Sequence, residues 1–139
     1  VLAEAGLVRL DLQHRISQIL PAQIVLPAVG QGALGLETRT DDDDTRGQLA
    51  SLDDPATHSA VIAERSLLVT LRGGCLAPIG AWARWEEDIL LLDAVCLDDK
   101  GSSRLTATGS SDGQDPAELG VRLANDLIAR GALELIGRS

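Results

Sequence analysis

The stretch LRGGCLAPIGA, residues Leu71–Ala81, lies between a helical pattern and a strand pattern. Gly73 and Gly74 are expected to end the helix, because glycine adopts the left-handed conformation that follows many helices without a steric penalty. Cys75 comes next, on a turn where side chains tend to be exposed, and Arg72 lies three residues before it. Exposure and nearby positive charge favour the reactive thiolate. The stretch therefore predicts a helix–turn–strand unit with a candidate reactive cysteine, although unpaired cysteines are more often structural.

The helices on the two sides of this turn carry strong boundary signals. Asp54 and Pro55 suit the cap and the first position of a helix that runs to about Leu71. Residues 115–118, Asp-Pro-Ala-Glu, form a capping box, and Gly131 is placed to end the helix that follows. This last helix has an apolar stripe that we expect to face the core, at Leu119, Leu123 and Leu127.

Between these helices the sequence predicts three antiparallel strands. Apolar patterns favour strands over 79–83 and 89–97, with Trp82 and Trp85 at the bend between them. Residues 98–101, Asp-Asp-Lys-Gly, are typical of a hairpin turn, and 104–109 of the return strand. Cys96 lies in an apolar run, where a cysteine acts as a small buried hydrophobe. Residues 53–139 therefore predict an α+β domain, a three-stranded antiparallel sheet packed by helices.

Residues 1–52 show no such self-sufficient pattern. An imperfect helical face spans 2–20, short strand patterns follow at 24–26 and 33–39, and four acidic residues precede a further helical segment. Because the chain begins at Val1 inside a helical pattern, we expect it to be part of a longer protein. The short strands then belong to sheets whose other strands lie elsewhere. Their exposed apolar edges favour self-association or pairing with a companion fragment.

Residues 30–35, Gly-Gln-Gly-Ala-Leu-Gly, form a literal G-x-G-x-x-G motif. A dinucleotide site requires a helix that starts on those glycines, with its N-terminus facing the pyrophosphate. The residues that follow alternate like a strand, so we reject the dinucleotide interpretation. The glycines indicate backbone flexibility, or room for a ligand close to the main chain.

The composition excludes several classes of function. The net charge is −9 over 139 residues, which disfavours a phosphate-backbone binder, and the two Trp residues are too few for nucleic-acid stacking. No apolar run approaches a membrane span and no signal-peptide pattern is present, so we expect a soluble cytoplasmic protein without a membrane partner. No Cys/His spacing predicts a metal site, and His14 and His58 are interpreted as surface residues.

Two blocks resemble the porphobilinogen deaminase family: LPAVGQGALGLETR at 26–39 and AERSLLVTLRGGCLAPIGA at 63–81. The resemblance starts near AGLVRL at 5–10 and extends to the last helix. It implies a three-domain protein, in which residues 1–26 end the second α/β domain and 27–52 form a hinge and a return to the first. Those two domains are periplasmic-binding-protein-like, and residues 53–139 correspond to the C-terminal cofactor-attachment domain. The family's catalytic aspartate lies in the part that is absent here.

The resemblance also implies a function and a site. The family condenses four porphobilinogen molecules into hydroxymethylbilane with release of ammonia, a transferase step of tetrapyrrole and heme biosynthesis. Its primer is a dipyrromethane cofactor joined by a thioether to the cysteine that corresponds to Cys75. Arg9 and Arg39 match family arginines that bind pyrrole carboxylates, and Gln31 and Gly32 fall where the chain runs beside the cofactor.

Other functions stay open at this point. The isolated chain is expected to be inactive, because substrate protonation and ring binding depend on absent residues. The C-terminal domain could instead be a non-catalytic structural or small-molecule-binding module. An unrelated cysteine-nucleophile enzyme is the third alternative, although no histidine lies near Cys75 in the sequence. Mass spectrometry of the intact chain would separate the first two alternatives from this third one, because a covalent dipyrromethane adduct is peculiar to the family.

Overall fold

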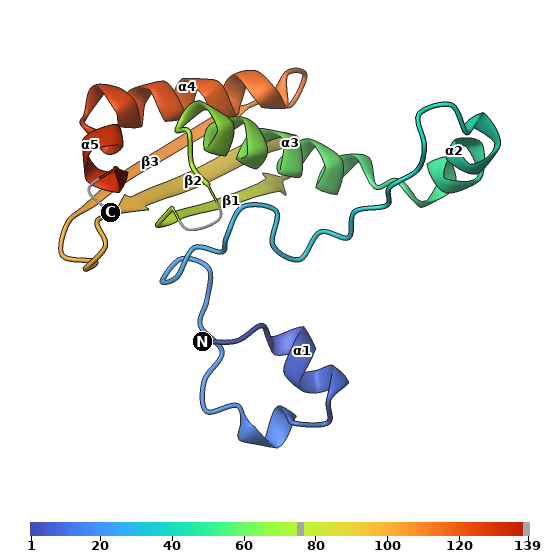
Figure 1. Cartoon of the computed structure of the whole chain (residues 1–139), viewed down its shortest axis with the longest axis horizontal. Coiled ribbons are helices and arrows are strands. Elements are labelled where there is room, and N and C mark those ends of the chain that lie inside the picture. The colour runs from blue at the N-terminus through green and yellow to red at the C-terminus, as the bar shows by residue number, and fades with distance from the viewer. Residues whose placement is uncertain (75–76, 138–139) are drawn as a thin grey trace.

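A computed structural model describes residues 1–74 and 77–137 of the chain. Its central element is a three-stranded antiparallel sheet in the order β1-β2-β3, formed by β1 (Ile79–Glu86), β2 (Ile89–Leu97) and β3 (Arg104–Ser111). Helices α3 (Pro55–Thr70) and α4 (Pro116–Ala129) pack together over one face, and the short α5 (Ala132–Ile136) follows α4 (Figure 1). The α+β class and the three-stranded sheet are therefore confirmed.

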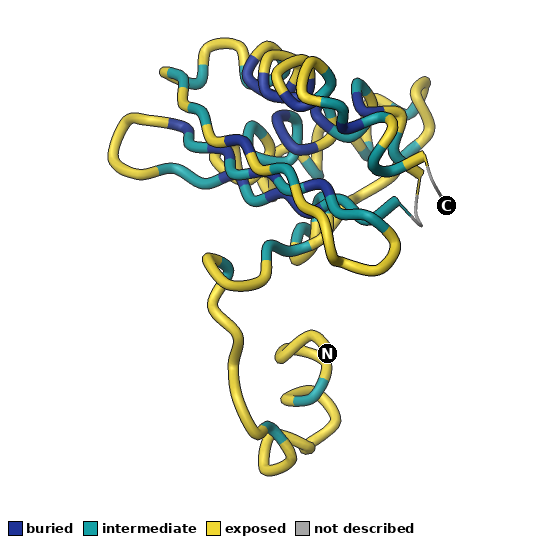
Figure 2. Tube along the Cα trace, turned by 90° about the vertical axis from the view of Figure 1, so that its left-hand side faces the viewer, coloured by how far each residue is buried: buried dark blue, intermediate teal, exposed yellow. Residues whose placement is uncertain are grey.

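The core lies between this sheet and the two long helices. Leu119, Leu123 and Leu127 are at most 4% exposed, which confirms the predicted stripe on α4. Their partners are alternate residues of the strands and the inner face of α3, and Figure 2 shows the buried residues gathered in this layer. The helices approach closely because Gly120 has no side chain, and a Cβ there would overlap the carbonyl oxygen of Ala63 on α3.

The predicted helix starts are confirmed by their caps. The Asp54 side chain accepts a hydrogen bond from the Thr57 N–H at 2.7 Å, and that of Asp115 accepts one from the Glu118 N–H at 2.9 Å. Each bond satisfies a backbone donor that has no partner inside its helix. At the end of α4, Gly131 adopts a left-handed φ of 91°, as expected.

The end of α3 differs from the sequence prediction. The left-handed residue is Arg72, with a φ of 54°, and not a glycine. The N–H of Gly73 donates to the Leu68 carbonyl and that of Arg72 to the Val69 carbonyl, both at 3.0 Å, which is a Schellman motif. Gly73 is needed for space instead, since a Cβ there would lie 2.6 Å from Leu68 Cδ1 and 2.7 Å from Ile79 Cδ1.

The first strand is also longer than the pattern predicted. Trp82 and Trp85 lie inside β1, paired with Asp93 and Leu90 of β2, so their placement at the bend was wrong. Strand alternation sends them to opposite faces. Trp85 donates its indole N–H to Ser59 on α3 at 3.0 Å, whereas the Trp82 ring lies 3.9 Å from the Arg84 guanidinium on the other face.

The outer edge of β3 is partly covered by one arginine of α4 and by the arginine that follows this helix. Arg122 donates to the Ser110 carbonyl and Arg130 to the Thr106 carbonyl, both at 2.8 Å. These bonds occupy acceptors that an exposed edge strand would offer to another chain.

Residues 1–52 lie outside this core, and all of them are described. They contain α1 (Glu4–Arg9), a 3₁₀ turn η1 (Gln13–Arg15), α2 (Asp43–Leu49) and a 3₁₀ turn η2 (Ala50–Leu52), and none of their residues is buried (Figures 1 and 2). The strands expected at 24–26 and 33–39 do not form, because neither segment pairs with a neighbouring strand. The helical pattern over 2–20 yields only α1 and η1. Among the described residues, no helix is long and apolar enough to cross a membrane.

Candidate functional site

The glycines of the G-x-G motif form two overlapping turns. The Gln31 N–H donates to the Ala28 carbonyl at 3.0 Å, and the Ala33 N–H donates to the Gly30 carbonyl at 3.3 Å. Gly30 and Gly32 occupy the third position of these turns with φ of 71° and 89°, a conformation that favours glycine. Residues 30–39 contain no helix, so the helix that a dinucleotide site requires does not start on these glycines.

The outer side of this glycine turn, residues 28–33, is open. Gln31 and Gly32 are exposed, and a Cβ built at Gly30 or Gly32 would meet no atom within 4 Å. The Gln31 side-chain oxygen accepts from the Ala28 N–H at 3.1 Å, which fixes the direction of its amide. Space is therefore free for a ligand beside the main chain at the two residues predicted to contact one.

The inner side of the same segment is docked on the free edge of β1. The Ala81 N–H donates to the Pro27 carbonyl at 3.0 Å. Leu26 lies against Gly80, where a Cβ would come within 3.0 Å of the Leu26 Cβ. The segment before the glycine turn thus covers the start of the strand that leaves the Gly73–Gly74 turn.

Glu64 makes the strongest link in this arrangement, and the sequence prediction missed it. Its carboxylate accepts the Gly30 N–H at 2.6 Å and the Ala83 N–H at 2.8 Å, and the residue is only 7% exposed. Burial raises the pKa of Glu64 above its ordinary value, and the bonds from Ala83 and Gly30 oppose that rise. A signal was present, because Glu64 occupies the same helix face as the buried Leu67 and Leu71.

The structure describes the residues on both sides of the predicted attachment cysteine. Cys75, the predicted attachment residue, and Leu76 lie outside the described residues. Before them, a Cβ at Gly74 would meet nothing within 4 Å. After them, the Ala77 N–H donates to the Gly74 carbonyl at 3.0 Å, and the Leu97 N–H donates to the Pro78 carbonyl at 2.9 Å.

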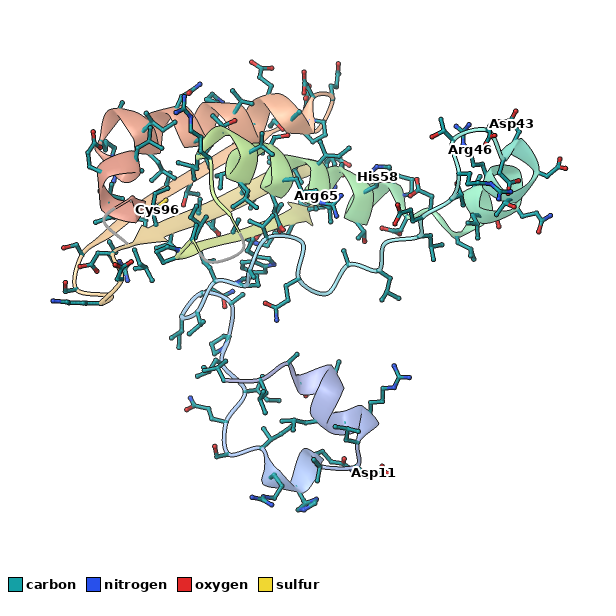
Figure 3. The ribbon with its side chains drawn as sticks, viewed as in Figure 1. Asp11, Asp43, Arg46, His58, Arg65 and Cys96 are labelled. Carbon is teal, nitrogen blue, oxygen red and sulfur yellow. The ribbon has the colours of Figure 1, made fainter. Side chains whose placement is uncertain are left out.

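Cys96 is the buried cysteine that the sequence predicted. It is 0% exposed on β2, and desolvation raises the pKa of its thiol to about 11 (Figure 3). At neutral pH it is therefore a protonated packing residue with little thiolate to react.

The two arginines singled out from the sequence lie on outlying segments. Arg9 is exposed in the last turn of α1, which hangs away from the sheet (Figure 1). Arg39 precedes α2, and its side chain is 82% exposed with Asp42 at 3.6 Å. The structure brings Gln31 and Gly32 to the edge of the C-terminal domain but does not bring either arginine there.

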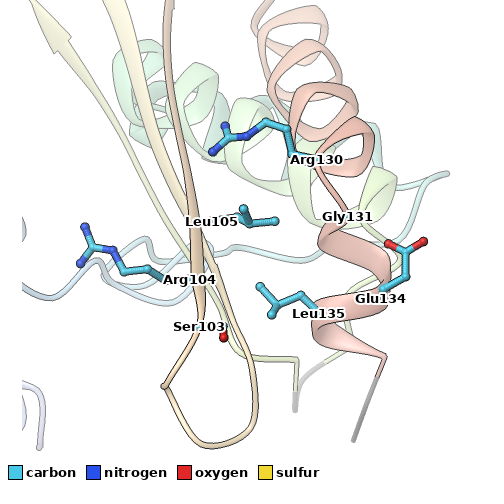
Figure 4. Close-up of a pocket in the computed structure, with 7 residues that line it drawn as sticks. All are labelled: Ser103, Arg104, Leu105, Arg130, Gly131, Glu134 and Leu135. Atoms are coloured by element: carbon cyan, nitrogen blue, oxygen red, sulfur yellow. The ribbon is translucent and has the colours of Figure 1, made fainter.

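Two other polar features are accounted for without a ligand. His58 is a surface residue, as predicted, and its Nδ1 lies 3.1 Å from Asp53 (Figure 3). A shallow hollow of about 220 Å³ lies between β3 and α5 (Figure 4), but its Arg130 already binds the Thr106 carbonyl and Asp126. Within residues 1–74 and 77–137, no group of His, Cys, Asp and Glu side chains could hold a metal ion.

The fold and the site define an α+β domain with a glycine-rich turn docked on the edge of its sheet. Residues 58–129 match the family model described as "Porphobilinogen deaminase, C-terminal domain". Residues 1–47 match the model described as "Porphobilinogen deaminase, dipyromethane cofactor binding domain". The chain belongs to the porphobilinogen deaminase family.

Similar curated proteins carry the same family name. The chain is 48% identical over 139 residues to a porphobilinogen deaminase of Brevibacillus brevis, and 43% identical over 136 residues to one of Deinococcus radiodurans. Each alignment covers 98% of this chain but only 44% of the relative. The chain therefore spans less than half the length of these relatives.

Proposed function

We propose that this chain is the C-terminal part of an enzyme that joins four porphobilinogen molecules head to tail into hydroxymethylbilane and releases ammonia. The observation that carries the proposal is the docking of the glycine turn on β1, the strand that leaves the Gly73–Gly74 turn. The two motifs behind the family resemblance thus belong to one unit. Because the chain spans less than half of its relatives, the activity is proposed for the longer protein, and the isolated chain should be inactive.

The proposed cofactor is a dipyrromethane held by a thioether to Cys75. The site fits such a group, since the space beside Gly30, Gly32 and Gly74 is open and a thiol is a suitable nucleophile. When bound, the group supplies the primer to which pyrrole units are added. Attachment through an aminomethylpyrrole forms an S–C bond and breaks a C–N bond, and the thiol proton leaves with ammonia. Cys75 would hold the group through this bond, which would keep the end of the growing chain close to the next monomer.

The remaining roles follow from the carboxylates of the pyrroles. Gln31 and Gly32 border the open side of the glycine turn, and the Gln31 amide NH₂ can donate to a carboxylate. Arg9 and Arg39 offer planar forks that suit carboxylates. In this proposal the parts of the chain that carry them approach the glycine turn in the longer protein: segment 1–26 of the second domain for Arg9, and the residues after the turn within the hinge segment 27–52 for Arg39.

Peptide mapping by mass spectrometry of the longer protein tests the proposal. The dipyrromethane should be found on the peptide that contains Cys75, and Cys75→Ser should lose it because serine is the weaker nucleophile and cannot form a thioether. Cys96→Ser is the matched control and should keep the adduct. An adduct on Cys96, or a thioether adduct retained in Cys75→Ser, would refute the proposed attachment.

A further inference from the structure

Glu64 is a buried carboxylate whose two oxygens serve two different parts of the chain. Oε2 accepts from Gly30, which is 34 residues away in the sequence, and Oε1 accepts from Ala83 on β1, 19 residues away. The side chain comes from the middle of α3, which is itself packed into the core. One rigid helix thus holds both the strand edge and the glycine turn.

The bond from Ala83 to Glu64 continues a row of hydrogen bonds along the free edge of β1, which starts at Ala81. Ala81 and Ala83 direct their N–H groups away from β2, toward the free edge of the sheet. Pro27 supplies the acceptor for Ala81, and Glu64 supplies the acceptor for Ala83. The chain cannot continue as a regular fourth strand, because it turns at Gly30. Glu64 supplies the acceptor that a fourth strand would have offered to Ala83, and it also accepts the N–H of Gly30, where the chain turns.

We propose that Glu64 is a positioning residue that fixes the glycine turn, and with it Gln31 and Gly32, to the C-terminal domain. The turn then moves with β1 and the Gly73–Gly74 turn rather than with the outlying residues 1–25. Its role for a bound pyrrole chain rests on the proposed function, whereas the anchoring of Gly30 does not.

The chemistry requires a carboxylate of this length. Both groups aimed at the side chain are donors, so a carboxylate, which only accepts, satisfies both. Glutamine would present an NH₂ group to one of the two N–H donors and lose that bond, and its neutral oxygen would hold the other donor more weakly than a carboxylate does. Aspartate is one methylene shorter, so it cannot reach both donors from the same helix position.

Amide hydrogen exchange on the whole 139-residue chain, read residue by residue by NMR, tests this role. In Glu64→Gln and Glu64→Asp, exchange of the Gly30 amide should accelerate roughly tenfold or more relative to the wild type, while the amides of the central strand β2 keep their rates. Glu118→Gln, an exposed substitution on α4, is the control and should change neither.

Two outcomes would overturn the proposal. One is an unchanged Gly30 rate in both Glu64 variants, and the other is an equal acceleration at Gly30 and in β2, which would mean a general loss of stability. If the variants do not fold, the wild-type chain decides the matter. The Gly30 and Ala83 amide shifts should titrate with the Glu64 carboxyl carbon, and independence of these shifts from it would refute the anchoring.

The exchange experiment needs no cofactor, so it separates this inference from the proposed function. A chain with responsive Gly30 exchange but no adduct on Cys75 would retain the anchoring role and lose the attachment. An adduct on Cys75 together with Gly30 exchange that does not respond to the Glu64 substitutions would retain the attachment and refute the anchoring role.

Discussion

Replacing Gly120 with alanine should destabilise the domain, against the usual effect of this change in a helix. Alanine has the higher helix propensity, so a glycine-to-alanine change inside an open helix stabilises by about 1 kcal/mol. At Gly120, however, the new Cβ would overlap the carbonyl oxygen of Ala63 and lie 2.8 Å from the backbone nitrogen of Leu67. Backbone atoms cannot rotate away, so α3 and α4 must separate.

The expected size follows from these two opposing terms. Overpacking typically costs 1–3 kcal/mol, and a clash with backbone belongs near the upper end, about 3 kcal/mol. Subtracting the propensity gain of about 1 kcal/mol leaves a net loss of about 2 kcal/mol in the free energy of unfolding. Gly47→Ala in α2 is the matched control, since a Cβ there meets nothing within 4 Å. Because α2 lies outside the core, its propensity gain should change the free energy of unfolding of the sheet domain by less than about 0.5 kcal/mol.

Urea denaturation followed by tryptophan fluorescence measures both variants. The chain has two tryptophans, Trp82 and Trp85, and both lie on β1, so the signal reports on the sheet. Gly120→Ala should shift the midpoint to lower urea while Gly47→Ala leaves it in place. A Gly120→Ala protein as stable as the wild type would refute the close helix contact.

Three further predictions use the same chain. Leu123→Ala should lower the free energy of unfolding by about 2–5 kcal/mol, because the side chain is 4% exposed, and a loss below about 0.5 kcal/mol would contradict its place in the core. Gly73→Ala should cost about 1–2 kcal/mol through its overlap with Leu68 and Ile79, whereas Gly74→Ala should be nearly neutral; equal effects in urea denaturation would count against the packing. The folded pKa of Cys96, about 11, exceeds its ordinary value of 9.0, so its contribution to stability is complete below pH 9 and is lost as the pH rises through 11. Cys96→Ala should show a smaller loss of stability over that pH range, and an unchanged pH dependence would exclude the thiol as its cause.

The local signals in the sequence were sufficient for most of the C-terminal domain. Helix ends depend on residues only a few positions apart, so the local sequence is enough to predict them. This holds for the caps at Asp54 and Asp115 and for the left-handed Gly131. The same holds for the buried stripe of α4 and for burial of Cys96, because the apolar patterns that contain them point toward one core. The glycine turn was recognised as a special backbone site for the same local reason.

What the sequence could not specify depended on contacts between distant segments. The left-handed residue after α3 is Arg72 rather than a glycine. Gly73 is required instead by the side chains of Leu68 and Ile79, which crowd it and which no local pattern brings together. The strands predicted at 24–26 and 33–39 did not form. A strand needs a neighbouring strand to bond its backbone groups, and an alternating pattern does not show whether such a neighbour is present.

The role of Glu64 was also decided only by the tertiary structure. The sequence pattern places Glu64 on the same helix face as the buried Leu67 and Leu71, but it does not show which donors could satisfy a carboxylate there. The folded chain brings two backbone donors, 34 and 19 residues away, to that carboxylate. Burying a charge is costly unless hydrogen bonds satisfy it, so its tolerance in the core depends on the docking of Gly30 and Ala83.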